Sequence, residues 1–297
     1  MNSEVTANDR LVDRIARSTT LDPLADALAP GLRRTFDSTG PIGPLSSILH
    51  GTPFGHPLHP PVTDIPIGAW SLAAIFDAFE AFGNTDFARA SDLAIGVGVA
   101  GGVVAIASGT AEWSDTVDDP RRLGMAHALF NTVAFSCYVA SLVLRGRGNR
   151  AAGLATAFVG YAVTSFSAYL GGELSCGMRL GTKHTAYPNV PPNDFAPALP
   201  VTELKDKPVR VEVGGIAMLL SRDEGGRISA ISAICTHRGA PLEQGEFADG
   251  YVTCPWHHAR FLLATGDVAR GPATFPLARF ETRVNGDVIE VRSAHAR

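Results

Sequence analysis

The chain has 297 residues, of which 45% are hydrophobic and 18% are charged, and its formal net charge at pH 7 is −4. This length allows two domains of ordinary size, and the apolar composition favours membrane-spanning segments over a purely soluble fold. The slightly acidic balance, without a dense Lys/Arg cluster, argues against a nucleic-acid partner. The four cysteines are too few for a disulfide scaffold in a chain this long.

Residues 1–50 are expected to form an amphipathic helical segment. Its apolar residues recur at spacings that favour short helices lying against a membrane or against the next domain: Leu11, Ile15, Leu21, Leu24 and Leu28. No apolar core follows the early charges, so we expect no signal peptide. The residues after Arg33-Arg34 are also too polar for the hydrophobic part of a twin-arginine signal.

Four apolar runs lie within residues 51–180, at 62–82, 93–109, 126–144 and 153–172. They approach the length of about 20 residues that a membrane-spanning helix needs, and the Gly/Ala-rich second run would let helices approach closely in lipid. A buried soluble bundle is the alternative, because acidic residues lie in or beside the runs: Asp64, Asp77, Glu80 and Asp92. The low number of charges favours a four-helix membrane domain.

A proline-rich linker at 181–200 separates this region from residues 201–297, where the pattern changes. Short β-branched segments between Gly-, Asp- and Asn-containing turns predict strands at 209–213, 217–221, 227–234, 251–254, 260–264, 279–284 and 287–292. The fold class is therefore multidomain. An N-terminal all-α four-helix transmembrane bundle is expected to precede a C-terminal all-β domain.

The β region contains Cys235-Thr236-His237 and, further on, Cys254-Pro255-Trp256-His257. Two cysteines and two histidines suit a tetrahedral zinc site, but zinc-finger spacing normally groups the cysteines together, whereas here Cys and His alternate. A Rieske centre instead needs two cysteines on one iron and two histidines on the other. His258 follows directly, but the C-x-x-H spacing selects His257.

On these motifs, residues 201–293 resemble the Rieske [2Fe–2S] family. The resemblance extends to Gly239–Leu242, Phe261–Gly266, Gly271–Ala273 and Pro276-Leu277. It implies an all-β Rieske-type domain holding one [2Fe–2S] cluster on Cys235, His237, Cys254 and His257, with His258 at a position where the family usually has glycine.

The sequence departs from the quinol-oxidising branch of this family. That branch has a disulfide between the two cluster loops, and the corresponding residues here are Ala240 and Trp256. It also has Ser and Tyr hydroxyls near the cluster, which Ala259 and Phe261 replace. Fewer hydrogen bonds to sulfur predict a reduction potential toward the low end of the Rieske range, about −150 mV. The chain thus resembles the ferredoxins that serve ring-hydroxylating oxygenases.

Residues 50–185 resemble a second family, the DUF2231 membrane domains, which has no assigned chemistry. The matching residues are His56–Pro60, Ile65–Gly68, Gly109–Trp113, His127, Asn131 and Gly171–Leu174. His56, His59 and His127 lie at or near the ends of apolar helices, and because polar groups at membrane depth are costly, they are functional candidates. Their capping of helix ends or bonding to interhelical carbonyls is the favoured interpretation. Haem b ligation and a quinone site remain open.

These observations predict a low-potential electron-transfer component rather than a complete enzyme. It would pass single electrons between a reductase and an acceptor such as an oxygenase. The alternatives are a subunit of a membrane oxidoreductase with haem or quinone in the bundle, and a redox sensor.

The expected location is the cell membrane, with several spans. Basic residues balance at four on each side of the spans: Arg121, Arg122, Arg179 and Lys183 against Arg89, Arg145, Arg147 and Arg150. Because iron–sulfur clusters are assembled in the cytoplasm, we expect the Rieske domain there.

Overall fold

The computed structural model describes residues 7–37, 39–40, 42–184 and 192–294, with backbone alone for residues 7–10. The chain divides into two compact units. The first contains Met1–Arg34 and Leu58–Leu180, and the second contains Thr35–Pro57 and Gly181–Arg297. This division places 35–57 with the β domain, whereas the sequence suggested boundaries at 50 and 180. Part of the expected proline-rich linker, residues 185–191, lies outside the described residues.

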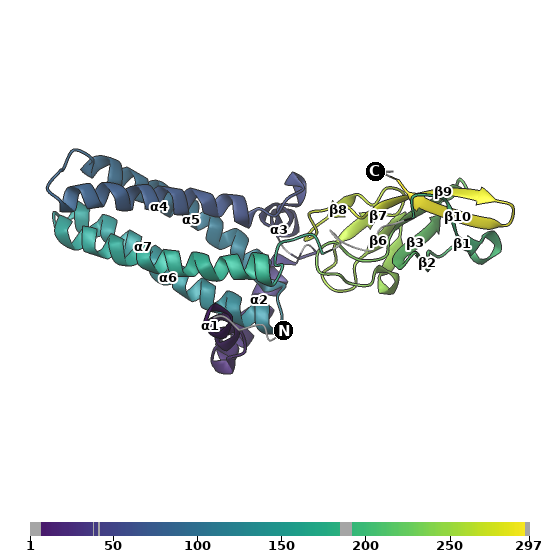
Figure 1. Ribbon diagram of the computed structural model, residues 1–297, viewed down its shortest axis with the longest axis horizontal. Helices are drawn as coiled ribbons and strands as arrows, with labels where there is room; N and C mark the ends of the chain where they lie inside the picture. The colour runs from purple at the N-terminus through teal and green to yellow at the C-terminus, as the bar shows by residue number, and fades with distance from the viewer. Residues whose placement is uncertain (1–6, 38, 41, 185–191, 295–297) are drawn as a thin grey trace. The chain divides into compact units, whose positions relative to one another are not determined.

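Four long helices lie side by side in the first unit (Figure 1): α4 (His59–Ala81), α5 (Ala88–Ser114), α6 (Asp118–Gly146) and α7 (Arg150–Gly172). A π-helical turn at Glu173–Gly177 extends α7. All four helices are long and apolar enough to cross a membrane. The predicted all-α bundle of four membrane-capable helices is therefore confirmed. The helices are longer than the apolar runs because their polar ends, such as Asp118–Arg122, are helical too.

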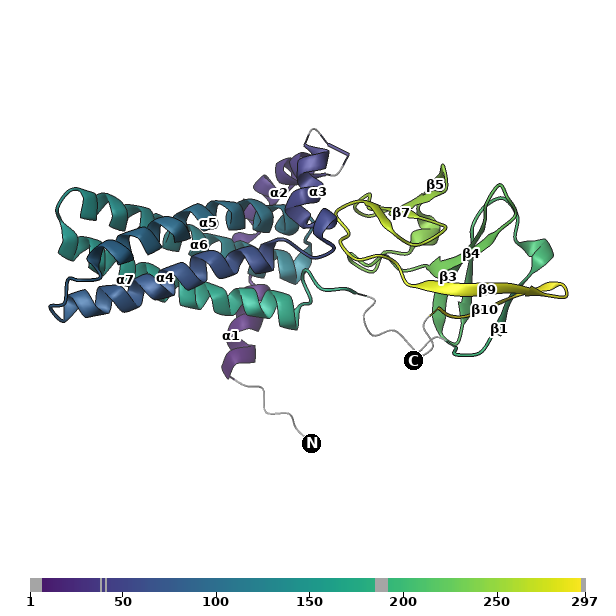
Figure 2. The ribbon, with the colours of Figure 1, turned by 90° about the horizontal axis from the view of Figure 1, so that it is seen from above.

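Helices α1 (Ala7–Ala16) and α2 (Asp22–Phe36) pack on one end of this bundle (Figure 2). Small side chains make the contact: Val12 and Ala16 pack in a cluster with Leu123 and Leu170, and Ala25 and Ala29 pack near Trp113 and Met125. Both segments are helical, as the sequence indicated, but the larger residues Leu11, Leu24 and Leu28, which were expected to pack, are exposed. Small residues allow the closer approach to the bundle, which leaves the leucines on the outer face.

The bundle consists of two similar helical hairpins, α4–α5 and α6–α7. Helix α4 buries Pro66, Trp70, Ala73 and Asp77, and α6 buries Ala134, Tyr138, Ser141 and Arg145, each 68 residues further on. The glycines that face these helices are likewise related by 62 residues: Gly98 with Gly160, and Gly109 with Gly171. Trp70 and Tyr138 stack with their ring centroids 4.1 Å apart, so α4 and α6 meet at equivalent positions.

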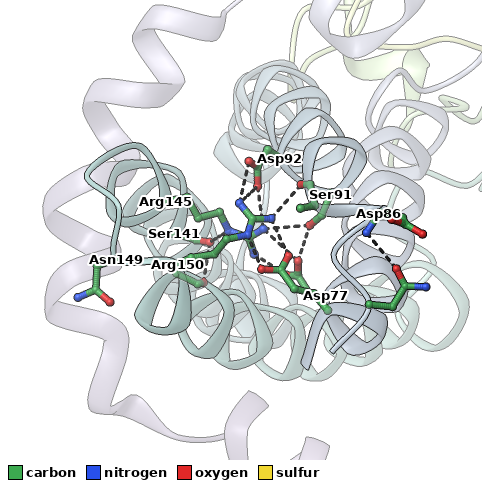
Figure 3. A network of polar contacts seen from close by, with 12 residues as sticks. Asp77, Asp86, Ser91, Asp92, Ser141, Arg145, Asn149 and Arg150 are labelled. Atoms are coloured by element: carbon green, nitrogen blue, oxygen red, sulfur yellow. Dashed lines mark hydrogen bonds and ion pairs between the residues drawn. The ribbon is translucent and has the colours of Figure 1, made fainter. Parts of the chain in front are cut away.

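A buried ionic network joins the two hairpins near their connecting loops (Figure 3). The Arg145 guanidinium binds the Asp77 carboxylate, and both side chains are almost completely buried. Arg145 also donates to Ser91, at 3.1 Å, and to Asp92, at 2.9 Å. Arg150 binds Asp92 as well. The acidic residues that allowed a soluble interpretation are thus largely paired with arginines inside or beside the bundle.

The second unit contains two antiparallel sheets. The larger has the order β1-β10-β9-β4-β3-β2, and the smaller has the order β5-β6-β7-β8. The first sheet comprises β1 (Ala196–Pro200), β2 (Val209–Val213), β3 (Ile216–Arg222), β4 (Ile228–Ser232), β9 (Arg279–Asn285) and β10 (Val288–Ser293). The second comprises β5 (Glu246–Ala248), β6 (Tyr251–Thr253), β7 (Arg260–Leu262) and β8 (Val268–Arg270). The predicted all-β domain is confirmed, with three additional short strands: β1, β5 and β8.

Candidate metal centre

Two loops of the same backbone design carry the candidate ligands. The first follows β4 and the second joins β6 to β7. In each loop the cysteine amide donates to the carbonyl five residues later, Cys235 to Ala240 at 2.9 Å and Cys254 to Ala259 at 2.8 Å. The cysteine carbonyl in turn accepts from the amide four residues later. That residue is Gly239 in the first loop and His258 in the second, and both have positive φ.

The two thiols lie together in the domain core. Cys235 and Cys254 are buried in one cluster with Leu219, Leu242 and Phe261. The hydrogen bond between the two thiols, together with burial, raises the pKa of Cys235. The same hydrogen bond lowers the pKa of Cys254. Each sulfur also accepts hydrogen bonds from the backbone amides two and three residues after its cysteine. These amides belong to His237 and Arg238 at Cys235, and to Trp256 and His257 at Cys254. Amides directed at sulfur stabilise thiolates, the form that binds metal.

The two imidazoles lie together nearer the surface. The ring centroids of His237 and His257 are 5.0 Å apart with an interplanar angle of 84°, and both residues are partly exposed. Within the described part of the chain, no three Cys, His or carboxylate side chains converge on a single ion position. Two thiols in the core and two imidazoles nearer the surface, one of each on each loop, suit a centre with two cysteines on one iron and two histidines on the other. The residues present therefore fit a [2Fe–2S] cluster.

Ala240, Ala259 and Phe261, which the sequence analysis singled out beside the ligands, are fully buried apolar residues. All four cysteines are free. Trp256 is 53% exposed beside the second loop.

Residues 35–57 contribute a part of the site that sequence reasoning missed. Helix α3 (Gly43–His50) and the 3-10 turn at Thr52–Phe54 lie in the same unit as the β domain. Asp37 Oδ2 lies 3.2 Å from His258 Nδ1, and the Thr52 hydroxyl donates to the Ala273 carbonyl at 3.0 Å. His56 packs edge-on against Phe275. The sequence predicted a helical segment for residues 1–50 but gave no sign that residues 35–57 contact the β domain.

The remaining histidine candidates, in the bundle, bind carbonyl groups of the neighbouring helix. His59 Nδ1 lies 3.0 Å from the Ala105 carbonyl, and His127 Nδ1 lies 2.8 Å from the Ser167 carbonyl. Asn131 also lies 2.9 Å from His127 Nε2. These contacts correspond to the interhelical role that the sequence analysis favoured over haem ligation.

The fold and the site together define a class. Two buried thiols and two outer imidazoles on paired loops of a small antiparallel β domain are the site of a Rieske-type iron–sulfur protein, which holds a [2Fe–2S] cluster. The family model for the Rieske [2Fe-2S] domain matches residues 194–281. The chain belongs to the Rieske [2Fe–2S] family. Residues 55–184 match the family of predicted membrane proteins DUF2231.

Several known proteins are similar to the Rieske part. The 3-phenylpropionate/cinnamic acid dioxygenase ferredoxin subunit of Shigella flexneri is 33% identical over 91 residues, which cover 30% of this chain and 84% of the subunit. Human apoptosis-inducing factor 3 is 35% identical over 117 residues, 39% of this chain but 19% of that protein. The cytochrome b6-f complex iron-sulfur subunit of Chlorobaculum thiosulfatiphilum is 38% identical over 72 residues, 24% of this chain and 39% of the subunit.

Among solved structures, the ferredoxin of carbazole 1,9a-dioxygenase from Nocardioides aromaticivorans aligns with a TM-score of 0.32 at 29% identity. The alignment covers 33% of this chain and 97% of the ferredoxin.

Proposed function

We propose that this protein is a membrane-anchored Rieske electron carrier that passes single electrons between a reductase and an acceptor such as an oxygenase. The observation that carries the proposal is the pairing of two buried thiols with two partly exposed imidazoles in one small domain. Similarity to a dioxygenase ferredoxin subunit along most of that subunit's length supports the ferredoxin role. A Rieske cluster supplies reversible one-electron chemistry when it is bound.

In this proposal each loop gives one ligand to each iron. Cys235 and Cys254 hold the inner iron, where burial and backbone amides keep the thiolates dry and stabilised. His237 and His257 hold the outer iron, and their partly exposed rings provide the short path to a docked partner protein. Iron content and cluster absorption of the four single Cys→Ser or His→Ala variants test this ligand set, and any variant that keeps a normal cluster would remove its residue from it.

We further propose a low reduction potential of about −150 mV. Apolar Ala259 and Phe261 lie fully buried at positions where hydroxyl groups would stabilise the reduced cluster. A redox titration followed by EPR measures the midpoint, and a value well above zero contradicts the proposal. Phe261→Tyr offers a matched change, because it adds one hydroxyl to the same ring and should raise the midpoint.

The helical unit would serve as the anchor, with the Rieske domain in the cytoplasm. Four membrane-capable helices and the match to a predicted membrane-protein family support the anchoring. In right-side-out cells an added protease should leave the C-terminal domain intact, and in inverted vesicles it should digest that domain. The opposite pattern would place the domain outside the cytoplasm.

An optical difference spectrum separates this proposal from a haem-containing subunit. Broad bleaching on dithionite reduction, with two irons per chain, is expected for the cluster alone. A narrow α-band with additional iron would instead assign haem to the bundle and make the protein a transmembrane electron-transfer subunit.

A further inference from the structure

The loop that carries His257 contains an unusual backbone position. His258 has φ of +59°, in the left-handed region that glycine adopts readily and that is costly for a residue with a Cβ. The equivalent residue of the first loop is Gly239, with φ of +75°. The two loops otherwise have equivalent backbone hydrogen bonds. The second loop therefore has a histidine at a left-handed position where the first loop has glycine.

Two contacts hold His258 in this conformation. Its ring lies 3.2 Å from the Asp37 carboxylate through Nδ1, and its carbonyl accepts a hydrogen bond of 3.0 Å from the Arg270 guanidinium. Asp37 is itself fixed, because its other oxygen accepts hydrogen bonds from the amide and hydroxyl of Thr39, at 2.8 and 2.6 Å. A side chain from far along the sequence is thus anchored directly against the cluster loop.

Further contacts join the same segment to the support of the first loop. Thr52 donates to the carbonyl of Ala273, and a Cβ at Gly271 would collide with the Thr52 hydroxyl, so the segment lies close against this turn. Two residues later, the Phe275 carbonyl accepts a hydrogen bond of 2.6 Å from Thr236, which lies between Cys235 and His237. Residues 35–57 therefore contact structures that fix both loops.

We propose that residues 35–57 are a functional part of the cluster domain and that Asp37 is a positioning residue for the cluster, acting through His258 on the loop that carries His257. Neither family match includes Asp37, because they begin at residues 55 and 194. This inference rests on the proposed cluster function. The segment would then do more than connect the N-terminal helices to the bundle. Its contact with His258 would stabilise the strained backbone there, and Asp37 would place a carboxylate charge near the outer ligands.

The experiment uses the full-length protein in detergent with four variants: Asp37→Asn, Asp37→Glu, His258→Gly and the double variant Asp37→Asn/His258→Gly. Asp206→Asn is the matched control, because Asp206 is an exposed carboxylate in the loop before β2. Two quantities are measured: the EPR-monitored midpoint potential and the rate at which cluster absorption bleaches under a chelator.

We expect Asp37→Asn to raise the midpoint and to bleach several-fold faster, while Asp37→Glu and Asp206→Asn stay near the wild type. In the His258→Gly background the backbone strain is absent, so Asp37→Asn should no longer accelerate bleaching. This loss of effect is the expected sign of coupling between contacting residues, and a purely local fold defect would leave the midpoint of the remaining cluster unchanged.

Wild-type midpoint and bleaching rate in Asp37→Asn would overturn the inference, as would an acceleration that persists undiminished beside His258→Gly. Absence of a [2Fe–2S] signal in the wild-type protein would instead refute the proposed function. The two failures are therefore distinguishable.

Discussion

Replacing Arg145 with methionine should strongly destabilise the bundle. Arg145 is the buried counterion of Asp77, whose side chain is fully buried, and it also donates to Ser91 and Ser141. Among the described residues, the Asp77 carboxylate would keep only the Ser91 hydroxyl as a partner in Arg145→Met. Breaking a buried ion pair by removing one partner costs about 3–5 kcal/mol, so we expect a loss of free energy of unfolding in that range.

The assay is unfolding by SDS titration from dodecyl maltoside micelles, with helicity followed by circular dichroism. The double variant Asp77→Asn/Arg145→Met removes both charges and should cost less than Arg145→Met alone, because no unpaired carboxylate remains buried. Arg147→Met is the control, because Arg147 is exposed and lies two residues after Arg145, at the end of α6. A wild-type unfolding curve for Arg145→Met, or a double variant that costs as much as Arg145→Met or more, would refute the reasoning.

Three further outcomes test other parts of the structure. His257→Ala should abolish the cluster's EPR signal, whereas His258→Ala should retain it, and the reverse result would reassign the ligand. Gly98→Ala should cost about 1–3 kcal/mol because its Cβ would overlap an indole ring of α4, whereas Gly96→Ala, with open space around it, should be nearly neutral. A hydrogen bond from the Arg122 guanidinium of α6 lowers the pKa of Asp22 in α2. The contact between α2 and α6 should therefore persist above about pH 4 and weaken as the pH falls further, which is measured as faster hydrogen exchange in α2. Asp22→Asn should remove this pH dependence.

The sequence predicted the features that depend on local composition. Apolar runs predict long helices because a lipid-facing helix needs little else, and the alternation of Cys with His in two short motifs indicates a two-iron site without any knowledge of the fold. The main strands of the β domain followed in the same way from β-branched segments and turn residues. In these cases the signal lies within a few neighbouring residues.

The contacts of residues 35–57 could not be predicted in this way. Nothing around Asp37 indicates a partner more than two hundred residues later, because a single carboxylate in a polar stretch is an ordinary surface residue. The strand β1 was missed for a related reason: its sequence, APALP, contains two prolines and pairs only at the sheet edge with β10, where proline is tolerated. Tertiary context determines both features.

The two hairpins carry different residues where they meet and the same residue type where each packs on itself. Where the two hairpins meet, an identical residue in both copies would face itself: two aspartates, or two arginines, at positions 77 and 145 would repel inside the bundle. The pair is instead Asp77 with Arg145, of opposite charge, and the stacked pair is Trp70 with Tyr138. The outer contacts, where each hairpin meets only itself, keep the same residue type, as at Gly98 and Gly160. Opposite charges are therefore required at positions 77 and 145, so the pair that joins the two halves cannot be recognised as a repeat from residue identity.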